Sequence, residues 1–260
     1  MKKYLVLISL ILSLAAAWQA DGATTPDPRA MTFRPLAFRI PEVERVVLDN
    51  GMVVHLLEDH ELPLVTIQAY VKTGSIYEPD DKVGLAGLTG AALRGGGTAA
   101  TTPEALDSEL EFMASSIESG IGADSGTVTL TSLTKNLDRT LALFSQVMMS
   151  PTFREDRVTQ AKNRAIEAIR RRNDDPQEVG DRELSRAIYA GHPLGRIPTV
   201  ESVSAVTRDD LVAFHRAYYH PSNVILAVSG DFDRKGMLEK LQTVFGAWKK
   251  EEVALPDIPQ

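Results

Sequence analysis

Two strand-like segments, residues 45–48 and 52–57, lie on either side of Asn50-Gly51. Asn-Gly between β-rich segments is the strongest short-range signal for a hairpin, because the tight turns that join twisted antiparallel strands need positive φ angles. The compact part of the chain is therefore expected to begin with an antiparallel pair of strands.

The rest of the chain combines further strand-like segments with paired amphipathic helices. Thr102 followed by Pro103 is typical of a helix start, and Leu137, Leu141 and Phe144 recur at helical spacing. This order predicts an α+β fold, with a largely antiparallel sheet and helices packed on one face. The other strands are expected at residues 64–73, 116–122, 126–133 and 224–229, and the helices at residues 84–94, 102–115, 136–149, 156–173, 176–189, 207–219 and 235–245.

Proline-containing segments flank the compact region on both sides. Residues 23–42 hold several prolines and few periodic apolar residues, which predicts an extended arm. Residues 251–260 also contain prolines and predict a tail or linker. Residues 43–250 show no low-complexity break, so we expect them to form one domain.

The N-terminus has the parts of a secretory signal peptide. Lys2 and Lys3 give a positive start, residues 4–18 are mostly apolar, and small residues follow up to Gly22. The apolar stretch is shorter than the roughly 20 residues that a membrane-spanning helix needs. Residues 1–22 are therefore expected to be removed on export to the periplasm or the extracellular space, with a retained membrane anchor as the alternative.

Composition excludes several classes of function. The 260-residue chain has no cysteine, so it can form no disulfide scaffold, thiolate metal site or cysteine nucleophile. It has 28 basic and 35 acidic side chains, a net charge of −7, whereas a general nucleic-acid binder normally shows a basic field. No nucleic-acid partner is expected.

One histidine cluster has to be considered as a possible metal site. His55, Glu58 and His60 lie close together in sequence, but a helical zinc pair needs ligands at i and i+4. The two histidines are five apart on a predicted strand, where residues an odd number apart point to opposite faces. A solvated strand end is favoured over a zinc site. His215 and His220 are expected to pack and cap the end of a helix.

Serine and glycine patterns do not identify a site either. The chain has no Gly-x-Ser-x-Gly nucleophile elbow. The glycines at residues 95–97 are not followed by the Gly-Lys-Ser/Thr of a phosphate-binding loop. The residues alone therefore indicate no self-sufficient catalytic group.

Short motifs nevertheless follow one another in a distinctive order. They are VVLDNGMVVH (46–55), EDHELPLV (58–65), GSIYEP (74–79), GLA (84–86), DDP (174–176), GHPLGR (191–196), TRDDL (207–211), YYHPSN (218–223) and VSGD (228–231). Together they resemble the pitrilysin/insulinase family of zinc peptidases, which includes mitochondrial processing peptidase. The resemblance covers about residues 43–248 and implies the N-terminal metallohydrolase domain of that family.

The chain departs from this family at its chemistry. Active members carry His-x-x-Glu-His on the helix after Gly-Leu-Ala, where two histidines bind zinc and the glutamate activates water. Here the two histidine positions are Gly87 and Ala91, and the glutamate position is Gly90. The family's later glutamate ligand falls at Ala168 or, one residue away, at Glu167. The resemblance thus implies zinc in active relatives and no catalytic residue, metal ligand or cofactor in this chain.

Length is a second departure. Family members of this type carry two similar domains in one chain, and this sequence ends after the first. The resemblance implies either that the sequence is truncated or that a separate chain supplies the second half.

Three functions remain open. The chain is a non-catalytic partner of a zinc-bearing sister peptidase, a stand-alone peptide-binding or scaffolding module, or a metallopeptidase with displaced ligands at His55, Glu58 and His60. In the first two cases an extended peptide could add to a sheet edge. The candidate edge is the strand around residues 122–132, with Gly122, Ala123, Asp124 and Ser125 as its weak candidate site, although an ordinary edge strand is slightly favoured.

Overall fold

The computed structural model describes residues 27, 29, 31–33 and 41–258. The chain divides into two compact units, Met1–Ile40 and Pro41–Gln260, and the fold described below is that of the second unit. The expected signal peptide, residues 1–22, and most of the expected arm lie outside the described residues.

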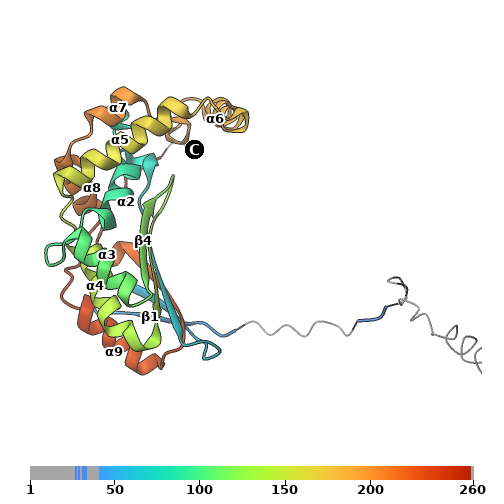
Figure 1. Ribbon diagram of the computed structural model, residues 1–260, viewed down its shortest axis with the longest axis vertical. Coiled ribbons are helices and arrows are strands. Elements are labelled where there is room, and N and C mark those ends of the chain that lie inside the picture. The colour runs from blue at the N-terminus through green and yellow to red at the C-terminus, as the bar shows by residue number, and fades with distance from the viewer. Residues whose placement is uncertain (1–26, 28, 30, 34–40, 259–260) are drawn as a thin grey trace, which may run out of the picture. The chain divides into compact units, whose positions relative to one another are not determined.

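A six-stranded sheet with the order β1-β2-β6-β3-β5-β4 forms one layer of this unit (Figure 1). All neighbouring strands run antiparallel except β2 and β6, which are parallel. This confirms the predicted largely antiparallel sheet and adds one parallel pair between strands far apart in the chain. The strands are β1 (Glu44–Val47), β2 (Val53–Glu58), β3 (Leu64–Val71), β4 (Ser116–Ile121), β5 (Gly126–Leu133) and β6 (Val224–Gly230).

The predicted first hairpin is present. Leu48 and Met52 close the turn with an amide-to-carbonyl hydrogen bond of 2.9 Å, and Gly51 has a φ of 88°, which explains why glycine follows the asparagine. The Asn50 side chain donates a hydrogen bond of 2.8 Å to the Phe245 carbonyl. The turn is thereby attached to the last helix of the unit.

Helices cover one face of the sheet, as predicted (Figure 1). One of them, the short helix α7, was not expected from the sequence. It is held by a capping box in which Thr199 and Ser202 exchange side-chain and backbone hydrogen bonds. The helices are α2 (Leu85–Gly95), α3 (Pro103–Phe112), α4 (Leu137–Met149), α5 (Glu155–Arg171), α6 (Pro176–Ile188), α7 (Val200–Ala205), α8 (Arg208–Tyr218) and α9 (Arg234–Phe245), with short 3-10 turns η2 (Ser75–Tyr77), η3 (Asp80–Lys82), η4 (Thr134–Asn136), η5 (Pro193–Gly195) and η6 (Pro221–Asn223).

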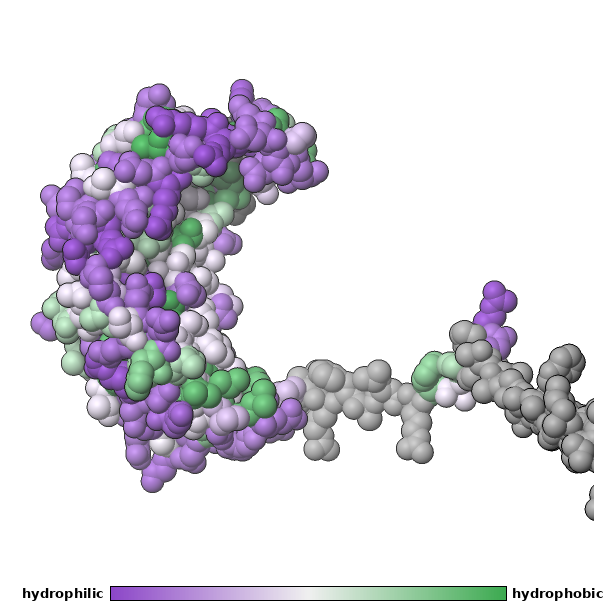
Figure 2. Space-filling model, in the orientation of Figure 1, coloured by the Kyte–Doolittle hydropathy of each residue, from purple (hydrophilic) through white to green (hydrophobic). Residues whose placement is uncertain are grey.

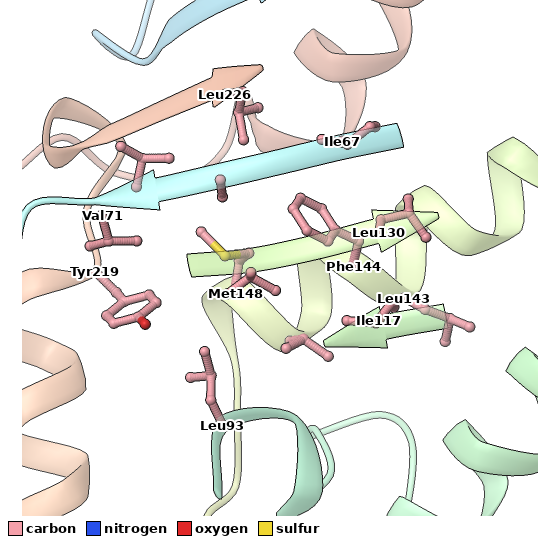
Figure 3. Close-up of a cluster of buried hydrophobic side chains, with 14 of the residues drawn as sticks. Ile67, Val71, Leu93, Ile117, Leu130, Leu143, Phe144, Met148, Tyr219 and Leu226 are labelled. Carbon is pink, nitrogen blue, oxygen red and sulfur yellow. The ribbon is translucent and has the colours of Figure 1, made fainter. Parts of the chain in front are cut away.

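The core lies between the sheet and these helices. Alternate residues of β3, Ile67 and Val71 among them, are fully buried because successive strand residues face opposite sides. They belong to the same buried cluster as Phe144 and Met148 of α4 and Leu93 of α2 (Figure 3). Burial of each such side chain contributes about 1.5–3 kcal/mol, so this shared cluster holds α2 and α4 on the sheet.

The other face of the sheet carries no helix and lies on the concave side of the unit (Figure 1). Most of its residues are uncharged and half-buried to exposed, and this surface is mostly pale in Figure 2; Arg45 of β1 and Glu118 of β4 are the charged residues among its strand positions. The alternation of buried and open positions in β3 and β5 explains this difference between the two faces. The open positions of these two strands are Leu64, Thr66, Gln68, Tyr70, Thr127, Thr129, Thr131 and Leu133.

Candidate functional site

Helix α2 carries the positions at which the resemblance places catalytic residues. Gly84, just before the helix, adopts a φ of 108°. The buried Glu78 carboxylate accepts hydrogen bonds from the backbone amides of Gly84 (3.0 Å) and Ala86 (2.5 Å). Burial raises the pKa of Glu78, and these two amide bonds and Arg196 oppose the rise. A carboxylate therefore holds the N-terminus of α2, where the helix dipole favours negative charge.

Arg196 fixes the loop that supplies Glu78. Its guanidinium donates to the Glu78 carbonyl (2.5 Å) and to the Asp80 carboxylate (2.9 Å). It also donates to the carbonyls of Ile76 (2.8 Å) and Ser75 (3.3 Å). One side chain thus ties the 3-10 turn η5 to the loop before α2.

A cleft of about 650 Å³ opens between α2 and α5. Gly87 and Ala91 of α2 and Ala168 of α5 line it, and all three are exposed. Glu167 is not among the residues that line it, and its carboxylate accepts from Arg171 at 3.0 Å. Of the two residues considered for the third ligand position, Ala168 faces the cleft.

The fourth position, Gly90, is closed by the sheet. A Cβ atom at Gly90 would lie 2.4 Å from the amide nitrogen of Ile121 and 2.8 Å from the carbonyl carbon of Gly120 in β4. The Gly90 carbonyl accepts a hydrogen bond of 2.7 Å from the Ser119 hydroxyl. Strand β4 therefore occupies the space that a side chain at position 90 would need.

These residues do not fit a zinc ion. A catalytic zinc site needs about three protein ligands with nitrogen, oxygen or sulfur donors. Gly87, Ala91 and Ala168 offer no side-chain donor to the cleft that they share. Across the part of the chain that the structure describes, no group of three or more His, Cys, Asp or Glu side chains is placed to hold a metal ion.

The cleft continues toward the edge of the sheet. A smaller pocket of about 170 Å³ shares Gly84, Gly87 and Pro198 with it and extends to Ile121 and Gly122 at the end of β4. The side of α2 that lines the cleft and the end of the edge strand β4 therefore line one continuous depression.

The residues predicted as a peptide-binding edge strand form a turn instead. Gly122, Ala123, Asp124 and Ser125 connect β4 with β5. The carbonyls of Gly122 and Ala123 accept hydrogen bonds of 2.9 and 3.0 Å from the amides of the 74–76 loop. The expectation that the strand following this turn lies at the edge was wrong, because β5 lies between β3 and β4, and β4 is the edge strand.

The histidine cluster of the first hairpin does not converge. His55 and Glu58 lie three residues apart on β2, so they start from opposite faces of the sheet. Glu58 accepts from the backbone amide of Arg234 (2.6 Å) at the start of α9, and His60 pairs with Asp231 at 2.7 Å. Glu58 and His60 are thus engaged separately, with different partners.

The two later histidines have structural roles, as expected. His220 donates through Nε2 to the Arg216 carbonyl (2.6 Å) in the last turn of α8. His215 donates through Nε2 to the Met148 carbonyl (2.9 Å) and stacks on Tyr219. Burial lowers the pKa of His215 to about 4, so it is neutral at physiological pH.

Sequence reasoning missed the arginines around the cleft. Arg94 of α2 and Arg157 and Arg164 of α5 all line it. Arg157 and Arg164 are seven residues apart, a spacing that places both on one face of a helix. That signal could have grouped them, but only the packing of α2 on α5 adds Arg94.

Two family models match this chain. The model described as insulinase (peptidase family M16) matches residues 53–199, and the model described as peptidase M16 inactive domain matches residues 205–260. The first match alone covers more than half of the chain. The protein belongs to peptidase family M16, in agreement with the resemblance found in its sequence.

Individual relatives share the fold over most of this chain. The mitochondrial-processing peptidase subunit beta of Dictyostelium discoideum is 21% identical over 216 residues, which are 82% of this chain and 46% of that protein. The crystal structure of a peptidase M16 inactive domain from Pseudomonas fluorescens has a TM-score of 0.78 at 27% identity, covering 84% of this chain and 53% of that one. The periplasmic protease PqqL from Escherichia coli has a TM-score of 0.75 at 21% identity, covering 85% of this chain and 26% of that one, which shows a common fold. The chain spans about half the length, or less, of the curated relatives it matches.

Proposed function

We propose that this chain is a catalytically degenerate member of peptidase family M16 and the non-catalytic partner subunit of an exported zinc peptidase that handles peptides. One observation carries the proposal. The positions expected to hold zinc, Gly87, Ala91 and Ala168, come together in one cleft and present no metal donor. The scaffold of the site is thus retained while its ligands are absent.

The position of the water-activating glutamate supports the same conclusion. Gly90 lies against the backbone of β4, so a side chain there would require the edge strand to move. If only a ligand were replaced, restoring that side chain could restore the site. Here α2 packs so closely on β4 that a side chain at position 90 has no room.

Peptide binding without hydrolysis remains open to this fold. Strand β4 pairs with β5 on one side and lies at the edge of the sheet. An extended peptide could add to an edge strand by main-chain hydrogen bonds. The depression that joins the cleft to Ile121 and Gly122 would then receive side chains near the end of that peptide.

The partner role and export draw support from the relatives. The D. discoideum relative is named as one subunit of a processing peptidase, and the E. coli structure is described as a periplasmic protease. This chain matches about half of the first protein and a quarter of the second, which is consistent with a function completed by another domain or chain. No helix among the described residues has the length and apolar character that crossing a membrane requires.

The test is reconstitution with a sister chain that carries His-x-x-Glu-His. We expect the purified protein alone to hydrolyse no peptide, and the mixture to hydrolyse peptides faster than the sister chain alone, with activity abolished by a chelator. Gly87→Ala, which leaves the cleft without donors, should activate the sister chain equally well. The proposal fails if no motif-bearing chain associates with this protein or is activated by it.

A stand-alone peptide-binding or scaffolding module is the second candidate, favoured by the intact edge strand and cleft. It predicts peptide binding by the isolated protein and no effect on any sister chain. Displaced zinc ligands at His55, Glu58 and His60 are the third candidate. Stoichiometric zinc in the purified protein, lost in a His60→Ala variant, would revive it.

A further inference from the structure

The charges around the α2–α5 cleft are opposite in sign to those of the whole chain. The protein has a net charge of −7, yet the charged residues that line the cleft are three arginines, Arg94, Arg157 and Arg164, and one aspartate, Asp107. A surface patch with the average charge composition of such an acidic protein would be negative. This cleft is instead a local concentration of positive charge.

Two of these arginines are paired within the protein and the third is not. Arg94 contacts the Asp107 carboxylate at 2.6 Å, and Arg157 contacts Glu104 at 2.5 Å. For Arg164, which is exposed, no carboxylate lies within ion-pair distance among the described residues. Arg164 therefore leaves the rim with an uncompensated positive charge.

The paired arginines also keep unused hydrogen-bonding capacity. The Nε–H groups of Arg94 and Arg157 are shielded from solvent and have no acceptor within the described part of the chain. Buried donors are normally satisfied. An acceptor delivered into the cleft within reach of either Nε–H group would supply the missing partner.

The walls between these arginines are apolar. They combine small residues, which leave the cleft wide, with larger aliphatic residues, which give it a hydrophobic surface. About 650 Å³ is within the range of pockets that enclose a sizeable ligand group. Ala91, Ala165 and Ala168 are among the small residues, and Leu88, Ile169 and Val203 are among the larger ones.

We propose that this cleft selects peptides in which an acidic residue lies close to a large apolar residue. The inference rests on the proposed peptide-handling function and specifies the peptides. The large side chain would fill the space between α2 and α5 left by Gly87 and Ala91, and the carboxylate would pair with Arg164 at the rim. An apolar floor with a positive rim complements both parts of this combination, whereas a peptide with one of the two residues makes only one of the two contacts.

A peptide bound on the edge strand can reach the cleft. The smaller pocket links the cleft with Ile121 and Gly122 at the end of β4. In an extended peptide, residues two apart point to the same side. A suitable probe therefore carries its acidic and apolar residues two positions apart.

The experiment measures binding of fluorescent dodecapeptides of otherwise identical sequence to the purified protein. One probe carries Glu and Phe two residues apart, a second Lys and Phe, and a third Glu and Ala. We expect the Glu/Phe peptide to bind about tenfold more tightly than either of the others, which corresponds to about 1.4 kcal/mol. Added salt should reduce this difference, since it screens the exposed pairing with Arg164.

Variants assign the effect to the cleft. Arg164→Ala should remove most of the preference for the Glu/Phe peptide over the Lys/Phe peptide, and Ala91→Leu should weaken both Phe peptides by filling the cleft. Arg45→Ala, which removes an exposed arginine of β1 at the other edge of the sheet, should change nothing. Melting temperatures of all variants report whether each one is folded.

The outcomes separate this inference from the function on which it rests. Equal binding of all three peptides overturns the selectivity and leaves peptide binding standing. Binding of none of them overturns the inference, whereas the proposed partner role is judged separately, by activation of the sister chain. Laurate, an apolar carboxylate without a peptide backbone, is a further probe, and binding of laurate without any peptide would overturn the assignment of the cleft to peptides.

Discussion

Gly90 of α2 lies against Ile121 of β4 so closely that a Cβ atom at position 90 would come within 2.4 Å of the Ile121 amide nitrogen. Gly87, one turn earlier on the same helix, has no atom within 4 Å of the corresponding position. The two glycines have the same helical backbone and opposite surroundings. Together they separate the effect of helix propensity from the effect of packing.

Gly87→Ala and Gly90→Ala should therefore change stability in opposite directions. Gly87→Ala should raise the free energy of unfolding by about 0.5–1 kcal/mol, because alanine is the better helix former and the site is open. Gly90→Ala should lower it by about 1–3 kcal/mol, because the added methyl group forces α2 and β4 apart. Urea denaturation of the two variants measures both values, and equal stabilisation by both would show that β4 does not confine position 90.

A metal site can be built in the cleft without restoring catalysis. The triple substitution Gly87→His, Ala91→His and Ala168→Glu places two imidazoles at i and i+4 beside a carboxylate on the facing helix. We expect it to bind about one equivalent of zinc and still to hydrolyse no peptide, because position 90 has no room for a general base. Titration calorimetry and a peptide assay read out the two properties.

The matched control keeps Ala168 and relies on the native Glu167. In that double variant the carboxylate stays paired with Arg171 outside the cleft, so zinc affinity should be at least tenfold lower than in the triple variant. Equal affinities would mean that Glu167, and not position 168, faces the metal.

His215 should make the protein sensitive to acid. Burial lowers the pKa of its imidazole from 6.5 to about 4. Above pH 6.5 the imidazole is neutral in both folded and unfolded chains, and between pH 6.5 and 4 only the unfolded chain gains the proton. Stability is therefore lost as pH falls through this window, by about 3 kcal/mol in all.

His215→Gln tests this assignment, since glutamine can still donate to the Met148 carbonyl but does not titrate. The free energy of unfolding of the variant should depend less on pH between 6.5 and 4 than that of the natural protein. Parallel curves for the two proteins would assign the acid sensitivity to other groups. His215→Phe, which removes the donor as well, should lower stability at every pH in the window.

Arg196 should be needed as arginine and not merely as a cation. Its planar guanidinium donates to four carbonyls and one carboxylate at once, and the single ammonium of lysine cannot reach all of them. Arg196→Lys should cost about 2–3 kcal/mol and speed amide hydrogen exchange in the loop before α2. Arg186→Lys on α6, where the exposed arginine makes one ion pair with Glu183, should cost less than about 0.5 kcal/mol.

Local signals in the sequence predicted most of the elements. The Asn50-Gly51 turn, the proline after Thr102 and the periodic apolar residues of α4 act over a few residues, so they were readable without knowledge of the fold. Helix α7 was missed because it is only six residues long and depends on its capping box and on the buried Val203. The edge position was assigned to the wrong strand of the β4–β5 hairpin, because nothing within a hairpin says which of its strands meets β3.

By itself the sequence determined that this protein has no zinc motif on the helix that follows Gly84, since Gly87 and Ala91 bear no metal donor in any fold. Only the tertiary structure decided that Ala168 rather than Glu167 faces these positions, because neighbouring helical residues point about 100° apart and the phase is set by how α5 packs on α2. The same packing decided that Gly90 is closed by β4 and that three arginines surround one apolar cleft. These properties depend on contacts between segments far apart in the chain, which no local pattern encodes.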